Sequence, residues 1–258
     1  MAGEAERPAR ALAKSIAESV DAPARLLRVL PELLSDLRSL GGLPREVVDL
    51  LERAGCDEGW RVLDLACGKG AVAVELAERV GCRVLGVDAF APFIGSARAW
   101  AKERGVGRLV RWRVADVRRV KATARYDAAL MVGLFGFEQA AGLLRGHVRR
   151  GGVYLIDDAV LSRRDPKRKG WPARADARGH FKGLGDELLE EFVPSVGELR
   201  RLNSDIETAI MFRASVLAEE HPTLRWELQN YVRRQVEAGR MLEKSLRPVV
   251  WVVRKDGG

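Results

Sequence analysis

Short apolar runs alternate with longer amphipathic stretches between Trp60 and Asp158. The runs are rich in Val, Leu and Ile and read RVLDLA (61–66), CRVLGVD (82–88), LVRWRVAD (109–116), YDAALMVG (126–133) and GGVYLIDD (151–158). Apolar residues recur at helical spacing in the stretches 71–80, 91–105 and 138–150. Strands that alternate with helices predict a parallel sheet covered on both faces. The expected fold class is α/β: a Rossmann-like, doubly wound, mostly parallel sheet of about seven strands, whose antiparallel last strand is PVVWVVRK (248–255).

The segments outside this alternation are predicted to be mainly helical. Residues 9–40 show three- and four-residue apolar spacing, with Pro23 expected to start a second helix and Pro31 to kink it. After Asp158 we expect a basic loop at 161–183, a short helix at 186–192, a strand at 196–204, and helices at 205–220 and 223–246. A capping box of Ser204 and Glu207 would open the first of these two helices. The predicted organisation is an N-terminal helical cap (1–43) and a main domain (44–258) that contains a basic flap (161–183) and a helical insertion (205–246).

The charge of the chain is concentrated in the basic flap. The net charge is +8, and residues 161–183 contribute +6 of it. The cationic residues there are Arg163, Arg164, Lys167, Arg168, Lys169, Arg174, Arg178 and Lys182. Such a segment is either a solvated loop or a site-adjacent flap that attracts nucleic acid or an acidic small molecule.

Several absences narrow the class of protein. The three cysteines show no CxxC spacing, so neither a zinc site nor a disulfide framework is expected, and no metal is predicted. No uncharged apolar stretch reaches 18 residues, and the first ten residues, MAGEAERPAR, do not resemble a secretory signal. We therefore expect a cytoplasmic protein without a membrane span.

A glycine-rich turn follows the first strand of the alternation. In VLDLACGKG (62–70), small residues let the backbone turn sharply and approach a ligand, and the next helix presents free N–H groups. Asp88 ends the second strand, where an acid can accept both hydroxyls of a ribose. Gly68-x-Gly70-x-x-Ala73 fits the relaxed dinucleotide fingerprint. However, Asp64 would oppose a bound pyrophosphate and suits a cationic partner, such as the ammonium group of an amino acid.

The motif Asp64-x-Ala66-x-Gly68-x-Gly70 resembles the first motif of class I S-adenosylmethionine-dependent methyltransferases. The resemblance covers residues 44–160 and the last strand, and is closest to the ubiquinone and menaquinone biosynthesis branch. It departs from the family at Arg150, which stands where a proline usually precedes the two glycines. It implies S-adenosyl-L-methionine as the cofactor and 44–258 as a methyltransferase domain. The implied cofactor-binding residues are Asp64, Ala66, Gly68 and Gly70, the ribose-binding Asp88 with Ala89, the adenine-contacting Asp116 with Val117, and Gly133 beside the methionine moiety.

The resemblance implies in-line attack of a nucleophile on the sulfonium methyl group. We expect a small-molecule acceptor, with the basic flap favouring an anionic one, and no base is evident beyond the candidates Asp158 and His180. The acid pair Asp157–Asp158 fits a structural role in capping the strand at least as well as a catalytic one. The alternatives are an RNA or protein methyltransferase that uses the flap, a non-catalytic cofactor-binding module and, more distantly, a nicotinamide oxidoreductase. A homodimer stays open.

Overall fold

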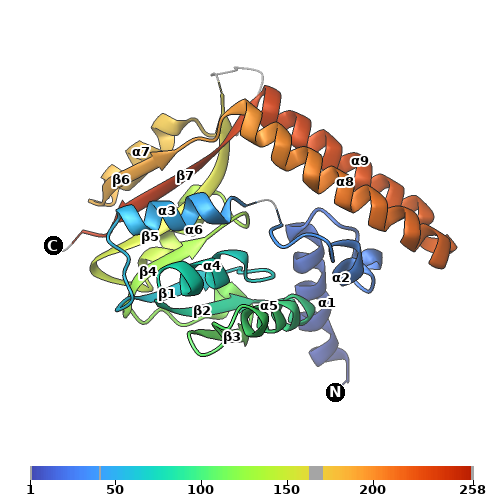
Figure 1. Cartoon of the computed structure of the whole chain (residues 1–258), viewed down its shortest axis with the longest axis horizontal. Helices are drawn as coiled ribbons and strands as arrows, with labels where there is room; N and C mark the ends of the chain where they lie inside the picture. The colour runs from blue at the N-terminus through green and yellow to red at the C-terminus, as the bar shows by residue number, and fades with distance from the viewer. Residues whose placement is uncertain (1, 41, 163–170, 257–258) are drawn as a thin grey trace. The chain divides into compact units, whose positions relative to one another are not determined.

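The computed structural model describes residues 2–40, 42–162 and 171–256, with side chains from residue 11 onward. The chain divides into two compact units. Residues 1–41 and 196–243 form a helical unit, and residues 42–195 and 244–258 form a sheet unit. Figure 1 identifies the elements of both.

The sheet unit is built on seven strands in the order β3-β2-β1-β4-β5-β7-β6. The first five run parallel, whereas β7 is antiparallel to both β5 and β6. This arrangement confirms the predicted Rossmann-like fold class, including the antiparallel last strand. The strands are β1 (Arg61–Leu65), β2 (Arg83–Asp88), β3 (Val110–Val114), β4 (Tyr126–Met131), β5 (Val148–Leu161), β6 (Glu187–Phe192) and β7 (Leu246–Arg254).

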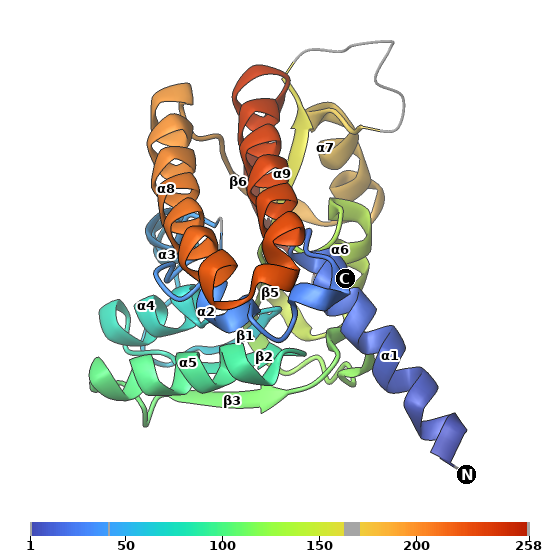
Figure 2. The same ribbon diagram turned by 90° about the vertical axis from the view of Figure 1, so that its right-hand side faces the viewer.

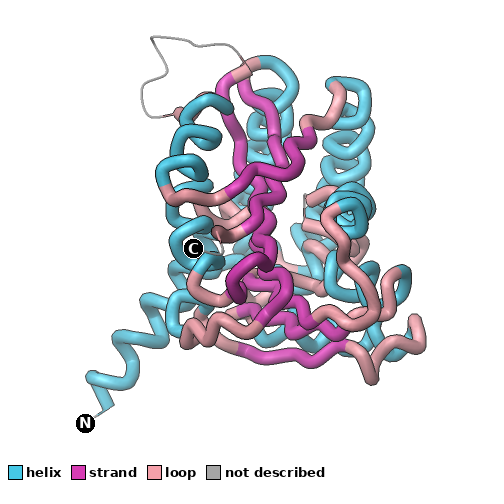
Figure 3. The backbone as a smooth tube through the Cα atoms, turned by 90° about the vertical axis from the view of Figure 1, so that its left-hand side faces the viewer, coloured by secondary structure: helices cyan, strands magenta, loops and turns pink. Residues whose placement is uncertain are grey.

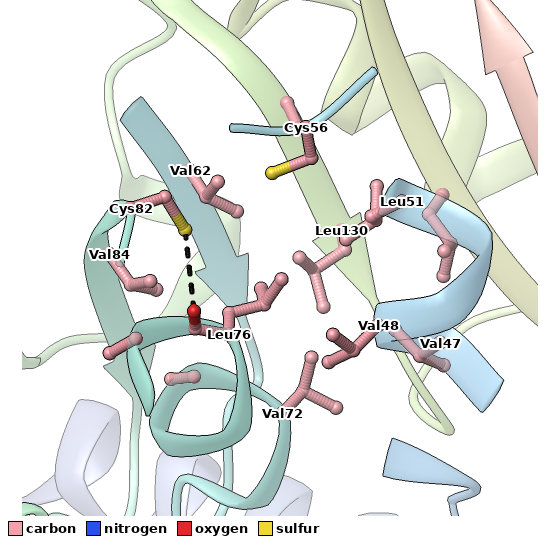
Figure 4. Close-up of a cluster of buried hydrophobic side chains, with 14 of the residues drawn as sticks. Val47, Val48, Leu51, Cys56, Val62, Val72, Leu76, Cys82, Val84 and Leu130 are labelled. Atoms are coloured by element: carbon pink, nitrogen blue, oxygen red, sulfur yellow. Dashed lines mark hydrogen bonds between the residues drawn. The ribbon is translucent and has the colours of Figure 1, made fainter. Parts of the chain in front are cut away.

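Helices cover both faces of this sheet (Figures 1 and 3). They are α3 (Pro44–Arg53), α4 (Ala71–Arg79), α5 (Ala91–Glu103), α6 (Phe137–Arg145) and α7 (Arg174–Gly183). Because successive strand residues point to opposite faces, the core forms two clusters. The first joins Val62 and Leu155 of the sheet to α3, α4 and α5 (Figure 4). The second joins Leu63 and Ile156 to α6 and α7. We refer to these as the α4 face and the α6 face of the sheet.

The helical unit contains α1 (Ala2–Ser19), α2 (Leu30–Leu33), α8 (Val196–Glu220) and α9 (Arg225–Lys244), with 3-10 turns at Ala24–Leu26 and Pro222–Leu224. The long helices α8 and α9 run side by side (Figures 1 and 2). The amide of Asn203 on α8 donates to the Gly239 carbonyl of α9 across 3.1 Å. Arg213 of α8 pairs with Asp36, so the segment after α2 is tied to the same helix. None of the described helices combines the length and the apolar character that crossing a membrane requires.

Three local predictions are wrong. Of the residues 186–192, expected as a short helix, Glu187–Phe192 form strand β6, because so short a segment gains more from pairing with the edge of β7 than from about two helical turns. Residues 196–204 are the first turns of α8 rather than a strand, and Ser204 lies inside that helix instead of capping it. The second N-terminal helix is also absent, since residues 24–33 form a 3-10 turn and a four-residue helix with Pro31 in its first turn.

The basic flap is only partly within the described residues. Arg163, Arg164, Lys167, Arg168 and Lys169 lie outside them. Residues 174–183, expected as loop, form helix α7, which buries Ala177 and Phe181 against the α6 face of the sheet. Arg174 and Arg178 both pair with Glu191 of β6. Two of the predicted flap cations therefore hold α7 against the sheet.

Candidate functional site

The loop after β1 has an unusual backbone. Ala66, Gly68 and Gly70 have φ values of 61°, 52° and 80°. Left-handed φ is strained for alanine but not for glycine. Cys67 N donates to the Val87 carbonyl of β2 at 3.1 Å, which holds the loop against the neighbouring strand. The loop ends at Gly70, where α4 begins and turns its first N–H groups toward the carboxyl edge of the sheet.

Trp112 of β3 fixes the position of this loop. A Cβ atom built on Gly70 would lie 2.5 Å from the Trp112 ring, and one built on Gly86 of β2 would also lie 2.5 Å from it. The indole therefore passes over Gly86 and reaches the start of α4. The sequence alone did not predict that Trp112 would pack against the glycine loop. The available signal was Gly86, since a glycine inside an apolar strand often marks a close approach.

Asp88 at the end of β2 binds two backbone N–H groups. Its Oδ2 accepts from Gly68 N at 2.9 Å, and its Oδ1 accepts from Phe90 N at 2.8 Å. Burial raises the pKa of Asp88, although these N–H groups oppose the shift. A carboxylate can accept about four hydrogen bonds, so Asp88 can still accept from a hydroxyl of a sugar.

Asp64 of β1 is a buried acid with an unsatisfied oxygen. Its side chain lies on the α4 face, the residue is 3% exposed, and its Oδ2 has no hydrogen-bond partner among the described residues. Burial, followed by the charge of Asp88, raises the pKa of Asp64 to about 8, while the Ala73 N–H in the first turn of α4 acts in the opposite direction. A carboxyl group placed this way destabilises the protein unless a ligand compensates it, which marks a candidate binding site.

Asp116, expected near an adenine, has both carboxylate oxygens engaged. It opens the 3-10 turn Val117–Arg119 and accepts from Arg118 N at 3.0 Å, from Arg118 Nε at 2.9 Å and, through its other oxygen, from Arg118 Nη2 at 2.9 Å. Val117 is buried in the core of the α6 face. Ala89 follows Asp88 directly and is partly buried.

Gly133 lies in the loop that follows β4, with a left-handed φ of 75°. Its N–H donates to Asp157 Oδ1 of β5 at 2.5 Å. Burial raises the pKa of Asp157 to about 7; the Gly133 N–H lowers it and the neighbouring Asp158 raises it further. Three acids with raised pKa values therefore lie on neighbouring parts of the sheet: Asp64 on β1, Asp88 on β2 and Asp157 on β5.

The two catalytic candidates lie on the other face of the sheet. Asp158 Oδ2 accepts from Phe137 N at the start of α6, and its Oδ1 accepts from Ala159 N. The His180 ring packs on Phe137 and Phe181, at centroid distances of 5.6 and 6.0 Å, and its Nε2 is buried without a partner among the described residues. Both residues contact Phe137 of α6, on the face of the sheet opposite to Asp64. Their catalytic roles stay predictions.

The family model for a methyltransferase domain matches residues 62–152. That stretch runs from β1 into β5 and includes the glycine loop, Asp64 and Asp88. A solved structure with a fold like this one is the S-adenosylmethionine-dependent methyltransferase from Geobacter sulfurreducens in complex with S-adenosyl-L-homocysteine. The TM-score is 0.75 at 21% identity, covering 88% of this chain and 97% of that one. Residues 62–152 therefore match the methyltransferase-domain family, and the chain shares the fold of that solved structure.

Two curated proteins resemble parts of this chain. Nocamycin O-methyltransferase from Saccharothrix syringae is 42% identical over 66 residues, and sterol 24-C-methyltransferase from Eremothecium gossypii is 28% identical over 118 residues. The matches cover 24% and 44% of this chain, but only 22% and 32% of those two proteins. The likeness is therefore confined to a part of each relative.

Proposed function

We propose that this protein transfers a methyl group from S-adenosyl-L-methionine to a small-molecule acceptor. The observation that carries the proposal is Asp64 Oδ2, which is buried beside the glycine loop and the first turn of α4 and has no partner within the described part of the chain. A buried carboxyl group with a raised pKa suits a cationic ligand, and the amino-acid end of this cofactor carries an ammonium group. The matched family model and the fold support the same cofactor.

The residues at the carboxyl edge suit the other parts of this cofactor. Asp88 would accept from the ribose hydroxyls with its remaining lone pairs, and the backbone of Ala66, Gly68 and Gly70 would lie against the ligand. Asp116 with Val117 would border the adenine, Ala89 the ribose and Gly133 the methionine moiety. For Asp116 to bind the adenine amine, its carboxylate would have to share an oxygen now used by Arg118.

The bound cofactor supplies an activated methyl group, so the protein needs chiefly to align the acceptor and exclude water. A small molecule is the favoured acceptor because both curated relatives are named for such activities, O-methylation and sterol methylation. No observation on the described residues favours RNA, a protein acceptor or a non-catalytic module. We also propose a cytoplasmic location and the domain division at residue 43; an anionic acceptor and a homodimer remain further proposals.

Calorimetry with S-adenosylhomocysteine and with NAD tests the cofactor assignment directly. We expect saturable binding of S-adenosylhomocysteine, no binding of NAD, and a strong loss of affinity in Asp88→Ala with the fold retained by circular dichroism. A matched control is Asp57→Asn, because Asp57 is an exposed acid in the loop before β1. Tight binding of NAD, or an unchanged affinity in Asp88→Ala, would remove the assignment.

A further inference from the structure

Asp157 occupies a defined position relative to Asp64. Asp64 pairs with Leu130 of β4, and Leu130 pairs with Leu155 of β5, so these three residues lie in one row across the sheet. Because side chains alternate between faces, Asp157 projects on the same α4 face as Leu155 and Asp64. It lies two strands away, about 10 Å sideways and about 7 Å nearer the carboxyl edge.

The strand order explains why this position matters. The chain passes from β1 outward to β2 and β3, then crosses back to β4 on the other side of β1. In open α/β sheets, ligands bind at such a switch point, here between the loops that follow β1 and β4. Asp157 accepts a hydrogen bond from Gly133 N and thereby holds the loop after β4. Asp157 and β5 lie on one side of this loop, and Asp64 and Asp88 lie on the other side. A ligand whose ribose lies at Asp88 and whose ammonium group lies at Asp64 would have its remaining open side toward Asp157.

Asp158 cannot occupy the same place. It lies on the α6 face, and backbone N–H groups occupy both of its oxygens. Asp157 accepts from Gly133 N with Oδ1, and neither of its oxygens is among the buried atoms that lack a partner. Of the two adjacent acids, Asp157 is therefore the one that faces the ligand side of the sheet.

We propose that the Asp157 carboxylate faces the transferable methyl group and accepts the proton of an oxygen or nitrogen nucleophile on the acceptor. The inference rests on the proposed methyltransferase function. In the step, the acceptor forms a bond to the methyl carbon as the carbon–sulfur bond breaks, and the acceptor proton passes to Asp157. S-adenosylhomocysteine leaves with the bonding pair on sulfur.

The surroundings of Asp157 suit this role. Burial brings its pKa to about 7, near the pH at which a general base is most effective. The expected acceptors are therefore hydroxyl groups and amines. A hydroxyl group must lose its proton when it is methylated, and a protonated amine must lose one before its lone pair can attack.

Sinefungin tests the proposal without knowledge of the acceptor. This cofactor analogue carries an amine where S-adenosylmethionine carries its methyl group, whereas S-adenosylhomocysteine has nothing there. A carboxylate beside that position would favour sinefungin by roughly tenfold or more. In Asp157→Asn we expect that preference to fall by roughly tenfold, with S-adenosylhomocysteine affinity changed by less than about twofold. The amide oxygen of Asn can still accept from Gly133 N, so the loop should keep its position.

Asp64→Asn is the matched comparison. It should weaken both ligands equally, because both have the same amino-acid end. Proton release measured by calorimetry at pH 6.5 adds a second readout: sinefungin should release more protons than S-adenosylhomocysteine in the native protein but not in Asp157→Asn. Other titrating acids near the ligand, Asp64 and Asp88, contact parts that the two ligands share, and Asp158 faces the opposite side of the sheet.

The possible outcomes distinguish a failure of the proposed function from a failure of the role proposed for Asp157. If neither ligand binds the native protein, the proposed function fails. If S-adenosylhomocysteine binds but the sinefungin preference survives in Asp157→Asn, or if both affinities fall together, Asp157 only supports the loop after β4 and the inference is overturned.

Discussion

The ionisation of Asp64 should control how tightly S-adenosylhomocysteine binds. The carboxyl group is almost fully buried, one of its oxygens has no partner among the described residues, and its pKa is about 8. Binding an ammonium group requires the charged form. With a pKa near 8, only about one tenth of the molecules carry that charge at pH 7, which costs about 1.4 kcal/mol of binding free energy.

Calorimetric titration of S-adenosylhomocysteine from pH 6 to pH 9 measures this effect. Its dissociation constant should fall about ninefold from pH 6 to 7, about fivefold from pH 7 to 8, and little above pH 8.5. Asp64→Asn should give weaker binding at pH 8 and a nearly flat profile, while the exposed control Asp57→Asn should reproduce the native profile. The same flat profile in the native protein and in Asp64→Asn would refute the reasoning.

Although Asp64→Asn should weaken ligand binding, it should increase the stability of the ligand-free protein. The folded-state pKa of Asp64 lies above its ordinary value of 3.8, so the acid is tolerated at low pH, and the fold loses stability as the pH rises toward 8. The loss approaches about 1.4 kcal/mol per pH unit over that interval. In urea unfolding, Asp64→Asn should therefore be more stable than the native protein, by a margin that grows from pH 5 to pH 8. An equal margin at every pH would show that the Asp64 carboxyl group does not titrate in this range.

Three further predictions concern stability. Gly86→Ala should lower the free energy of unfolding by about 1–3 kcal/mol in urea titration, because its Cβ would lie 2.5 Å from Trp112, and Trp112→Leu should restore part of the loss. Asp186→Ala should lower the free energy of unfolding by about 2–3 kcal/mol, because it removes the acceptor for the buried Tyr154 hydroxyl and the partner of the half-buried Arg145; a loss below about 1 kcal/mol would contradict this expectation. His147 is fully buried, neither ring nitrogen has a partner among the described residues, and burial lowers its pKa, so native stability should fall below pH 6.5 and His147→Leu should flatten that decline.

The sequence predicted the parallel part of the sheet because doubly buried strands have a strong local signature. The runs at 61–66, 82–88 and 126–133 each became a strand at almost the predicted residues. The segment 186–192 has no such signature: its sequence DELLEEF fits a short helix as well as an edge strand. Only the exposed edge of β7, almost 60 residues later in the chain, decides between the two. Tertiary context overrides local propensity in such segments.

The site was predictable to the extent that its residues lie next to strand ends. Asp64 and Asp88 were identified from their positions beside the glycine turn, and the structure places both at the same edge of the sheet. The choice between Asp157 and Asp158 was not accessible, because adjacent acids on one strand point to opposite faces and only the register with β4 tells which is which. Similarly, the stretch 138–150 was predicted to be helical throughout, but α6 ends at Arg145, and His147, which precedes β5, is fully buried.

The candidate site gathers several local arrangements that destabilise the free protein. Asp64 is a buried acid, one of whose oxygens finds no partner in the part of the chain that the structure describes, and Ala66 holds a left-handed backbone that costs of order 1 kcal/mol. Such arrangements persist only where the surrounding structure fixes them. Here the fixing comes from the central strands, which are buried on both faces, and from Trp112, which packs closely against Gly70 and Gly86. A ligand with a positive charge at Asp64 would remove the largest of these costs. Cofactor binding should therefore stabilise this part of the fold by more than the contacts of the ligand alone would supply.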